Sequence, residues 1–201
     1  MGITKLSKSG FKSSSYEKYN DFLAGNTAFS PPSFESIQTT TVGSGGSASV
    51  SFTSIPATYT HLQVRGIVRA SYADSNTSMR LTFNSDTGTN YNSHDLTGVN
   101  SSINAGNETS VAYIPFARGA YAGLTSGIFT SFVVDILDYA NTNKNKTTRT
   151  LTGYTSNGEG QISFRSGLWR STSAITSINM FSNVGDLMQY SSFALYGIKG
   201  A

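Results

Sequence analysis

The stretch IFTSFVVDILDY at residues 128–139 is the strongest apolar run of the chain and decides the fold class. It is followed by the polar segment NTNKNK at residues 141–146 and then by a second candidate strand at residues 147–154. A short apolar run, a polar turn and a second run are typical of two antiparallel strands. We therefore predict that residues 128–139 form a central strand and that residues 147–154 pair back against it.

Shorter segments on both sides of this run show the same period of two. In residues 61–70, Leu62, Val64 and Val68 face one way and the residues between them face the other. Residues 35–42 and 47–53 flank a glycine-rich turn, which predicts a hairpin. The remaining strand candidates are residues 79–83, 91–96, 111–116, 161–164, 177–181 and 192–198.

About ten short strands at this spacing predict an all-β fold. The favoured architecture is an antiparallel β-sandwich of jelly-roll type, with a barrel as the alternative. Residues 35–201 would form this domain and supply its core. Helix signals are nearly absent after residue 35, so we expect less than about 10% helix there, against a usual third.

The composition agrees with this fold and excludes several classes of function. The 201 residues hold 32 Ser and 24 Thr but only 12% charged residues. With no Cys and two His, disulfides and histidine-rich metal centres are excluded. The net charge of +3 comes without a Lys/Arg stripe, so no nucleic-acid partner is expected. No apolar run reaches the roughly 20 residues of a membrane span, so no membrane insertion is expected.

Residues 1–34 differ from the rest and predict an N-terminal extended arm with one short helix. Ser14 and Glu17 fit a capping box, and aromatic residues follow at helical spacing, which places the helix at about residues 15–24. A helix of this length is unstable alone in water and must dock on a surface. We predict that the arm binds a partner through basic and apolar side chains. These are Lys5, Lys8, Phe11, Lys12, Tyr16, Tyr19, Phe22 and Leu23.

The carboxylates of the sandwich are sparse and argue against catalysis. A glycosidase needs two carboxylates across a cleft, but Asp135 and Asp138 have odd spacing and fall on opposite faces of one strand. The loops near Asp74 and Asp86 offer oxygen ligands, which is the type that calcium prefers. These loops hold too few carboxylates for a calcium site. We predict a protein that is not an enzyme, without cofactor or metal. We also expect no cluster of perturbed titratable groups in a deep cleft.

Aromatic residues on or near loops supply a candidate glycan site. Trp169 lies beside Arg170 and is the single Trp, and an exposed Trp can stack on a sugar ring. Tyr72, Tyr91 and Tyr121 are further candidates for such a surface. The alternative for Trp169 is a half-buried position at a sheet edge, which its sequence context favours.

Several separated blocks occur in an order that resembles a family of phage virion structural proteins from marine and cyanobacterial phages. The blocks are NDFLAGN at residues 20–26, PPSFESI at 31–37, TVGSGG at 41–46, FTSIPATYTHLQVR at 52–65, DILDY at 135–139, KTTR at 146–149 and SFALYGIK at 192–199. The resemblance covers residues 16–201. It implies a non-enzymatic part of the virion, such as a head decoration protein or a tail fibre.

The same resemblance implies partners and a location. Other virion proteins would bind the N-terminal arm, the sandwich would be displayed outward, and the chain would form a homo-oligomer, a trimer by analogy. An alternative from a different class is a carbohydrate-binding module, free or on a fibre that recognises a host-surface glycan. That alternative depends on the aromatic residues named above.

Overall fold

The computed structural model describes residues 33–75 and 77–200, which contain twelve strands and no helix. Residues Phe34–Ala201 form one compact unit. The first strand begins at Phe34, the last residue of the predicted arm. The rest of the arm, its helix at residues 15–24 and the eight partner-binding residues from Lys5 to Leu23 lie outside the described residues, apart from Ser33.

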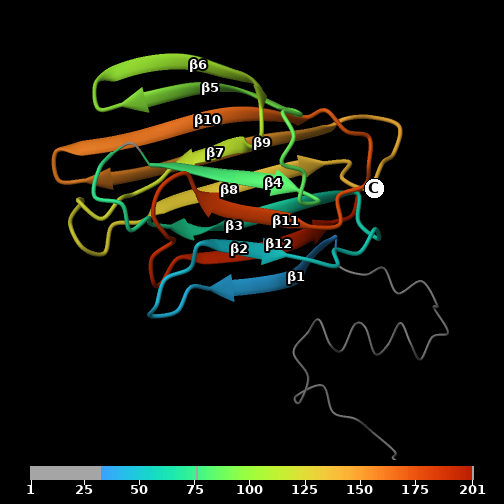
Figure 1. Cartoon of the computed structure of the whole chain (residues 1–201), viewed down its shortest axis with the longest axis horizontal. Helices are drawn as coiled ribbons and strands as arrows, with labels where there is room; N and C mark the ends of the chain where they lie inside the picture. Colours follow the sequence, from blue (N-terminus) through green and yellow to red (C-terminus); the bar gives the residue numbers. More distant parts are fainter. Residues whose placement is uncertain (1–32, 76, 201) are drawn as a thin grey trace, which may run out of the picture. The chain divides into compact units, whose positions relative to one another are not determined.

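The strands form two antiparallel sheets that pack face to face (Figure 1). They are β1 (Phe34–Thr41), β2 (Ser49–Phe52), β3 (His61–Val68), β4 (Ser78–Phe83), β5 (Tyr91–Val99), β6 (Ser102–Val111), β7 (Ile114–Arg118), β8 (Thr130–Leu137), β9 (Lys146–Ser156), β10 (Glu159–Trp169), β11 (Ile178–Ser182) and β12 (Ser192–Ile198). The larger sheet has the order β1-β12-β3-β8-β9-β10-β5-β6 and the smaller sheet β2-β11-β4-β7. The predicted all-β antiparallel sandwich is confirmed.

Two sets of strands follow from this order. In the first set, which we call the alternating strands, the chain passes between sheets: β1, β3, β8 and β12 lie in the larger sheet and β2, β4, β7 and β11 in the smaller. The other four strands are two hairpins, β5–β6 and β9–β10, inserted between alternating strands. Both hairpins join the larger sheet beyond β8, in the order β9-β10-β5-β6, and we call them the extension.

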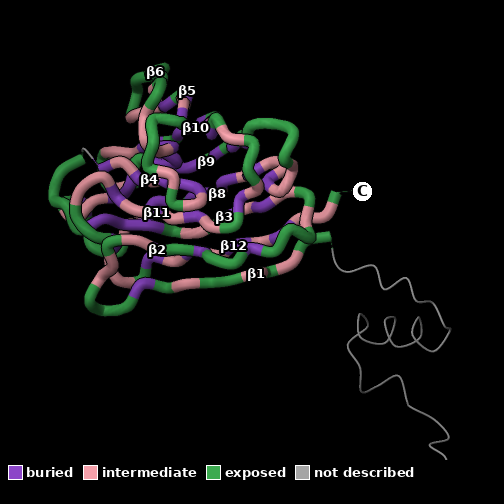
Figure 2. The backbone as a smooth tube through the Cα atoms, turned by 45° about the vertical axis from the view of Figure 1, so that its right-hand side comes forward, coloured by how far each residue is buried: buried purple, intermediate pink, exposed green. Residues whose placement is uncertain are grey.

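The alternating strands enclose the hydrophobic core, where the buried backbone of Figure 2 is concentrated. Phe132, Val134 and Ile136 point inward along β8, as the period of two predicts. The ring of Phe132 lies 5.0 Å from that of Phe116 on β7 and 5.5 Å from that of Phe193 on β12. The contact with Phe116 joins the two sheets, and β8 lies between β3 and β9, so it is a central strand, as expected. It pairs with β9 in the predicted manner.

The predicted hairpin between residues 35–42 and 47–53 is wrong. Phe34–Thr41 pairs with β12, whereas Ser49–Phe52 pairs with β11 in the other sheet. Gly46, at φ +71°, turns the chain from one sheet to the other. Flexible glycines permit a change of direction, but they do not fix the partner of the strand that follows.

The predicted strand at residues 111–116 is also corrected. The structure ends β6 at Val111 and begins β7 at Ile114, in different sheets. β6 is an edge strand that is exposed at nearly every position, so it has no apolar face to produce an alternating pattern.

Arg69, at the end of β3, is a buried cation held entirely by backbone carbonyls. Its side chain is largely enclosed, with the residue 5% exposed. The guanidinium donates to the carbonyls of Ala122, Leu124, Thr125 and Ile128 at 2.8–3.2 Å. These bonds offset the desolvation of the charge and fix the long connection between β7 and β8.

Lys146, the first residue of β9, is held in the same way. It is fully buried, and its Nζ donates to the carbonyls of Asn141 at 2.7 Å, Lys144 at 2.8 Å and Thr172 at 3.0 Å. Burial lowers the pKa of Lys146, but the three carbonyls satisfy the three donors of the ammonium group. The β8–β9 turn and the segment after β10 are therefore joined through one side chain.

Candidate functional site: the two faces of the extension

The outer face of the extension presents large apolar side chains to solvent. Leu151, Phe164 and Leu96 are direct neighbours on β9, β10 and β5, and each is more than half exposed. Ile162 on β10 is 61% exposed and Ile103 on β6 is 79% exposed. We call these five residues the apolar band. A contiguous exposed patch of this kind marks an interaction surface, unlike single scattered apolar residues.

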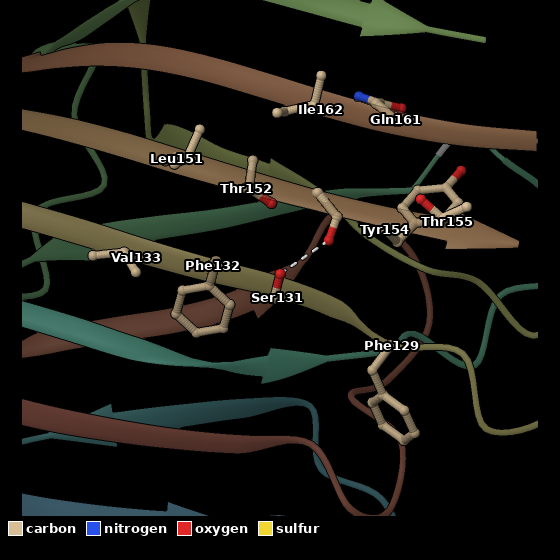
Figure 3. Close-up of a pocket in the computed structure, with 11 residues that line it drawn as sticks. Phe129, Ser131, Phe132, Val133, Leu151, Thr152, Tyr154, Thr155, Gln161 and Ile162 are labelled. Carbon is tan, nitrogen blue, oxygen red and sulfur yellow. Dashed lines mark hydrogen bonds between the residues drawn. The ribbon is translucent and has the colours of Figure 1, made fainter.

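A groove of about 570 Å³ lies beside the apolar band (Figure 3). Its floor is formed around Gly153, whose neighbours on the adjacent strands are Ser131 and Ile162. Ser131 Oγ donates to the Gly153 carbonyl at 3.2 Å. A Cβ at Gly153 would lie 2.9 Å from the Gln161 carbonyl oxygen, so a larger residue would force the strands apart. The outer face thus combines the ridges of Leu151 and Ile162 with an adjacent hollow.

Polar residues of both charge signs border the apolar band. Asp135, Arg149, Ser166 and His94 are successive neighbours across β8, β9, β10 and β5. Asp135 accepts from Gln63 Nε2 at 2.7 Å and from Arg149 Nη2 at 3.2 Å. The border is therefore mixed in charge and does not form the basic face that a nucleic acid would need.

The inner face of the extension is polar. Thr148, Thr150 and Thr152 point inward along β9 and are almost fully buried, as are Ser163 and Arg165 on β10. The hydroxyl oxygens of Thr148 and Thr152 have no hydrogen-bond partner. The extension therefore has the opposite polarity to the alternating strands, since its apolar side chains point outward and its polar side chains point inward.

A polar chamber of about 280 Å³ lies on this inner face, next to β4 and β7. Its charged lining consists of Arg80, Asp95, Glu108, Arg118 and Arg165. Burial lowers the pKa of Arg165, and the nearby Asp95 acts in the opposite direction. The five residues come from β4, β5, β6, β7 and β10, so no spacing in the sequence could have indicated that they meet.

Two of the four predicted glycan-binding residues belong to the core. Trp169 is 3% exposed and Tyr91 is fully buried, and their rings stack at 6.3 Å. Trp169 Nε1 donates to Asp86 Oδ2 at 2.7 Å, which holds the pKa of Asp86 below its ordinary value. Stacking on a sugar requires an open ring face, so a glycan role for Trp169 and Tyr91 is wrong. Trp169 is also more buried than the half-buried edge position considered for it.

The other two predicted residues, Tyr72 and Tyr121, lie on adjoining loops. The amide of Ala122 donates to the Tyr72 carbonyl at 2.7 Å, which links these loops. The Tyr72 side chain is exposed, whereas the Tyr121 hydroxyl donates to Glu159 Oε1 at 3.1 Å. Burial, together with this hydrogen bond, raises the pKa of Tyr121. Only Tyr72 and Tyr121 thus remain accessible among the four predicted aromatic residues.

The remaining acidic candidates have structural partners. Asp138 occupies the turn after β8, where its carbonyl accepts from the Asn141 amide at 3.0 Å and its carboxylate from Lys144 Nζ at 2.6 Å. Within residues 33–75 and 77–200, no three His, Cys, Asp or Glu side chains are grouped to hold a metal ion. The same residues include no helix that could cross a membrane.

No family model, no curated protein and no solved structure matches the chain. The resemblance to virion structural proteins therefore rests on the sequence blocks quoted above.

Proposed function

We propose that the chain is a non-enzymatic structural protein of a phage virion and that its copies contact one another through the apolar band. The observation that carries this proposal is the inverted polarity of the extension. Leu96, Leu151 and Phe164 are more than half exposed, while threonine or serine side chains on the same strands are buried. Covering each exposed side chain would contribute about 1 kcal/mol or more, half the value of full burial.

A second copy of the chain is the occupant that the outer face fits. The ridges of Leu151 and Ile162 and the hollow over Gly153 lie on one face, so a neighbouring copy can place its ridge in this hollow. The border carries both Asp135 and Arg149, and a surface of mixed sign is compatible with itself. A partner of one strong charge would leave half of this border unpaired.

The strand order supports a place in a virion. We infer that the eight alternating strands form a jelly roll, since they pass between two four-stranded layers at every step but one, from β4 to β7 in the smaller sheet. Jelly rolls occur in viral capsid and lectin domains. The sequence blocks add the specific implication of a decoration protein or tail fibre. In this proposal the N-terminal arm anchors the chain to other virion proteins, the sandwich points outward, and the homo-oligomer is a trimer by analogy.

Fewer residues support the alternative of a carbohydrate-binding module once the structure is considered. Trp169 and Tyr91 have no open face, so the aromatic version of this alternative depends on Tyr72 and Tyr121. The hydroxyl of Tyr121 is already bonded to Glu159. This bond leaves the Tyr121 hydroxyl with less capacity to bind a sugar, and we favour the assembly role.

The assembly role is tested by the mass of the full chain in solution. Light scattering after size exclusion should give an oligomer, and Leu151→Asp should raise the concentration at which it dissociates by about tenfold or more, because a charge would be buried. Thr39→Asp adds the same charge to an exposed position on β1 and should leave the oligomer intact. A monomeric wild-type chain, or equal behaviour of the two variants, would contradict the proposed contact.

The virion location is tested on particles of the phage that encodes the chain. Mass spectrometry of gradient-purified particles should detect the full chain at a fixed copy number. Deleting residues 1–26 should leave the sandwich folded, with an unchanged thermal melt, and should abolish its incorporation into particles. Full occupancy by the truncated chain would contradict the anchoring role of the arm.

A further inference from the structure

The polar chamber carries a further inference that does not depend on the apolar band. Charged side chains seldom gather in the interior of a sandwich without full pairing. The chamber gathers three guanidinium groups, those of Arg80, Arg118 and Arg165, and two carboxylates, those of Asp95 and Glu108. Its lining therefore has an excess of one positive charge.

Arg165 lies in the interior of the chamber and lacks a complete set of partners. The residue is 7% exposed, and its Nε is buried without a hydrogen-bond partner. Its Nη2 lies 3.7 Å from Asp95 Oδ2, an ion pair longer than a hydrogen bond. The same Asp95 oxygen accepts from Thr97 Oγ1 at 2.8 Å. Arg165 thus has hydrogen-bonding capacity that the protein does not use.

Arg80 and Glu108 add two further unpaired atoms. The Nε of Arg80 and the Oε2 of Glu108 are buried and have no hydrogen-bond partner. The guanidinium of Arg80 lies 3.8 Å from the ring centroid of Tyr113, which holds the side chain in place by a cation–π contact. Together with Arg165 Nε, these two atoms show that the charged groups around the chamber are incompletely paired.

The chamber is accessible and of useful size. Arg118 and Asn104 belong to its lining and are themselves exposed, so they form a route to solvent. Its volume of about 280 Å³ corresponds to about nine water molecules at ~30 Å³ each, or to one small organic ligand.

We propose that this chamber binds a hydroxylated monocarboxylate, the chemistry of a uronic or sialic acid residue. The ligand carboxylate accepts hydrogen bonds from Arg165 and its neighbouring guanidinium groups, a geometry for which arginine is well suited. A ligand hydroxyl donates to the carboxylate of Glu108, which an inorganic sulfate cannot do because it has no proton to donate. The single excess positive charge matches a monoanion.

Calorimetric titration of the full chain with glucuronate tests this proposal, with glucose and sulfate as matched probes. Glucuronate should bind at concentrations of up to about 10 mM, whereas glucose should show no heat because it lacks the carboxylate. Polygalacturonate distinguishes the source of the ligand. Binding of both the polymer and the free acid indicates a glycan, and binding of the free acid alone indicates a soluble metabolite. Either result supports the shared chemistry.

Two variants separate recognition from folding. Arg118→Gln changes an exposed residue and should weaken glucuronate binding about tenfold while the thermal melt stays unchanged. Glu108→Gln should strengthen sulfate binding more than glucuronate binding, because it removes a negative charge and replaces one carboxylate oxygen by an NH2 donor. Absence of glucuronate binding, equal binding of glucose, or sulfate binding as tight as glucuronate binding would overturn the proposal. Leu151→Asp should retain glucuronate binding, so failure of the assembly role is distinguishable from failure here.

Discussion

Four of the alternating strands share the larger sheet with the extension, but the two regions bury side chains of opposite polarity. On β8, Val134 points into the core, and on β9 the equivalent inward position, its direct neighbour, is Thr150. On the outer face, Leu151 and Phe164 are exposed. Successive side chains of a strand lie on opposite faces, so a shift of one residue in the pattern inverts a strand. Alternation thus shows that a strand has two unlike faces, whereas the neighbouring layer decides which one is buried.

This difference separates two properties of the molecule. The alternating strands bury aromatic and aliphatic side chains between the sheets and supply most of the stability. The extension places apolar side chains where a partner can cover them and charged side chains around a chamber. We expect substitutions to affect folding in the first region and binding in the second.

The largest contrast should come from two phenylalanines. Phe193 on β12 is buried against Phe132, and Phe193→Ala should lower the free energy of unfolding by about 3–5 kcal/mol because it leaves a cavity. Phe164 on β10 is 53% exposed, and Phe164→Ala should change it by no more than about 0.5 kcal/mol. Urea denaturation of dilute protein measures both. Equal losses would remove the distinction between the two regions.

Lys146 should give the next largest effect, at the point where the extension begins. Lys146→Met keeps the length of the side chain but leaves three carbonyls without their donor, and should cost about 2–3 kcal/mol of stability. Lys144 is the control, since its side chain is 56% exposed and pairs with Asp138. Lys144→Met should cost less than about 1 kcal/mol. Thermal melts that rank the variants in the reverse order would show that the carbonyl contacts are not stabilising.

Tyr91 is a residue of the extension that packs in the core, so it should affect folding and not binding. Burial raises its pKa to about 12, so the folded state holds a proton that the unfolded state loses near pH 10. The contribution of Tyr91 to the free energy of unfolding is therefore complete below pH ~10. It should fall by about 2–3 kcal/mol as pH rises to ~12. Tyr91→Phe should reduce this fall. Tyr190→Phe, at a residue 65% exposed, should leave the pH profile of chemical denaturation unaltered.

The smallest effects should differ in sign between two threonines. Thr130 Oγ1 on β8 accepts from the Ala120 amide at 2.6 Å and donates to the Arg118 carbonyl at 3.3 Å. Thr130→Val should therefore cost about 1 kcal/mol or more. Thr152 Oγ1 on β9 is buried and unpaired, so Thr152→Val should stabilise the fold by up to about 1 kcal/mol. A destabilising Thr152→Val would indicate that its hydroxyl has a partner in solution.

Sequence patterns predicted strands well where one face is apolar and failed where neither face is. The segments that became β3, β8 and β12 were found close to their observed bounds, because their inward residues are continuous apolar sets. β6 was missed because it is a polar edge strand. The Asn157-Gly158 pair between β9 and β10, with Gly158 at φ +89°, is a two-residue hairpin signal that would have extended both strands to this turn.

The candidate sites were less predictable than the strands. Ile162 and Phe164 alternate with polar residues in the sequence, but only the position of the smaller sheet shows that they face outward. Trp169 was named as a glycan candidate because it is the single Trp and lies beside Arg170, and its full burial had no local signal, since its partner Asp86 is 83 positions away. The chamber depends on five strands that meet only in the folded chain, so local spacing contains no signal for it.

The two carbonyl-held cations give the fold a particular tolerance of acid. The carboxylate of Asp86, whose pKa is lowered, contributes stability that is lost as pH falls through that value, because the protonated acid accepts less well. Arg69 and Lys146 bind backbone oxygens, which do not take up protons in this range. The loops that they hold should therefore stay closed in acid after contacts that depend on carboxylates have weakened.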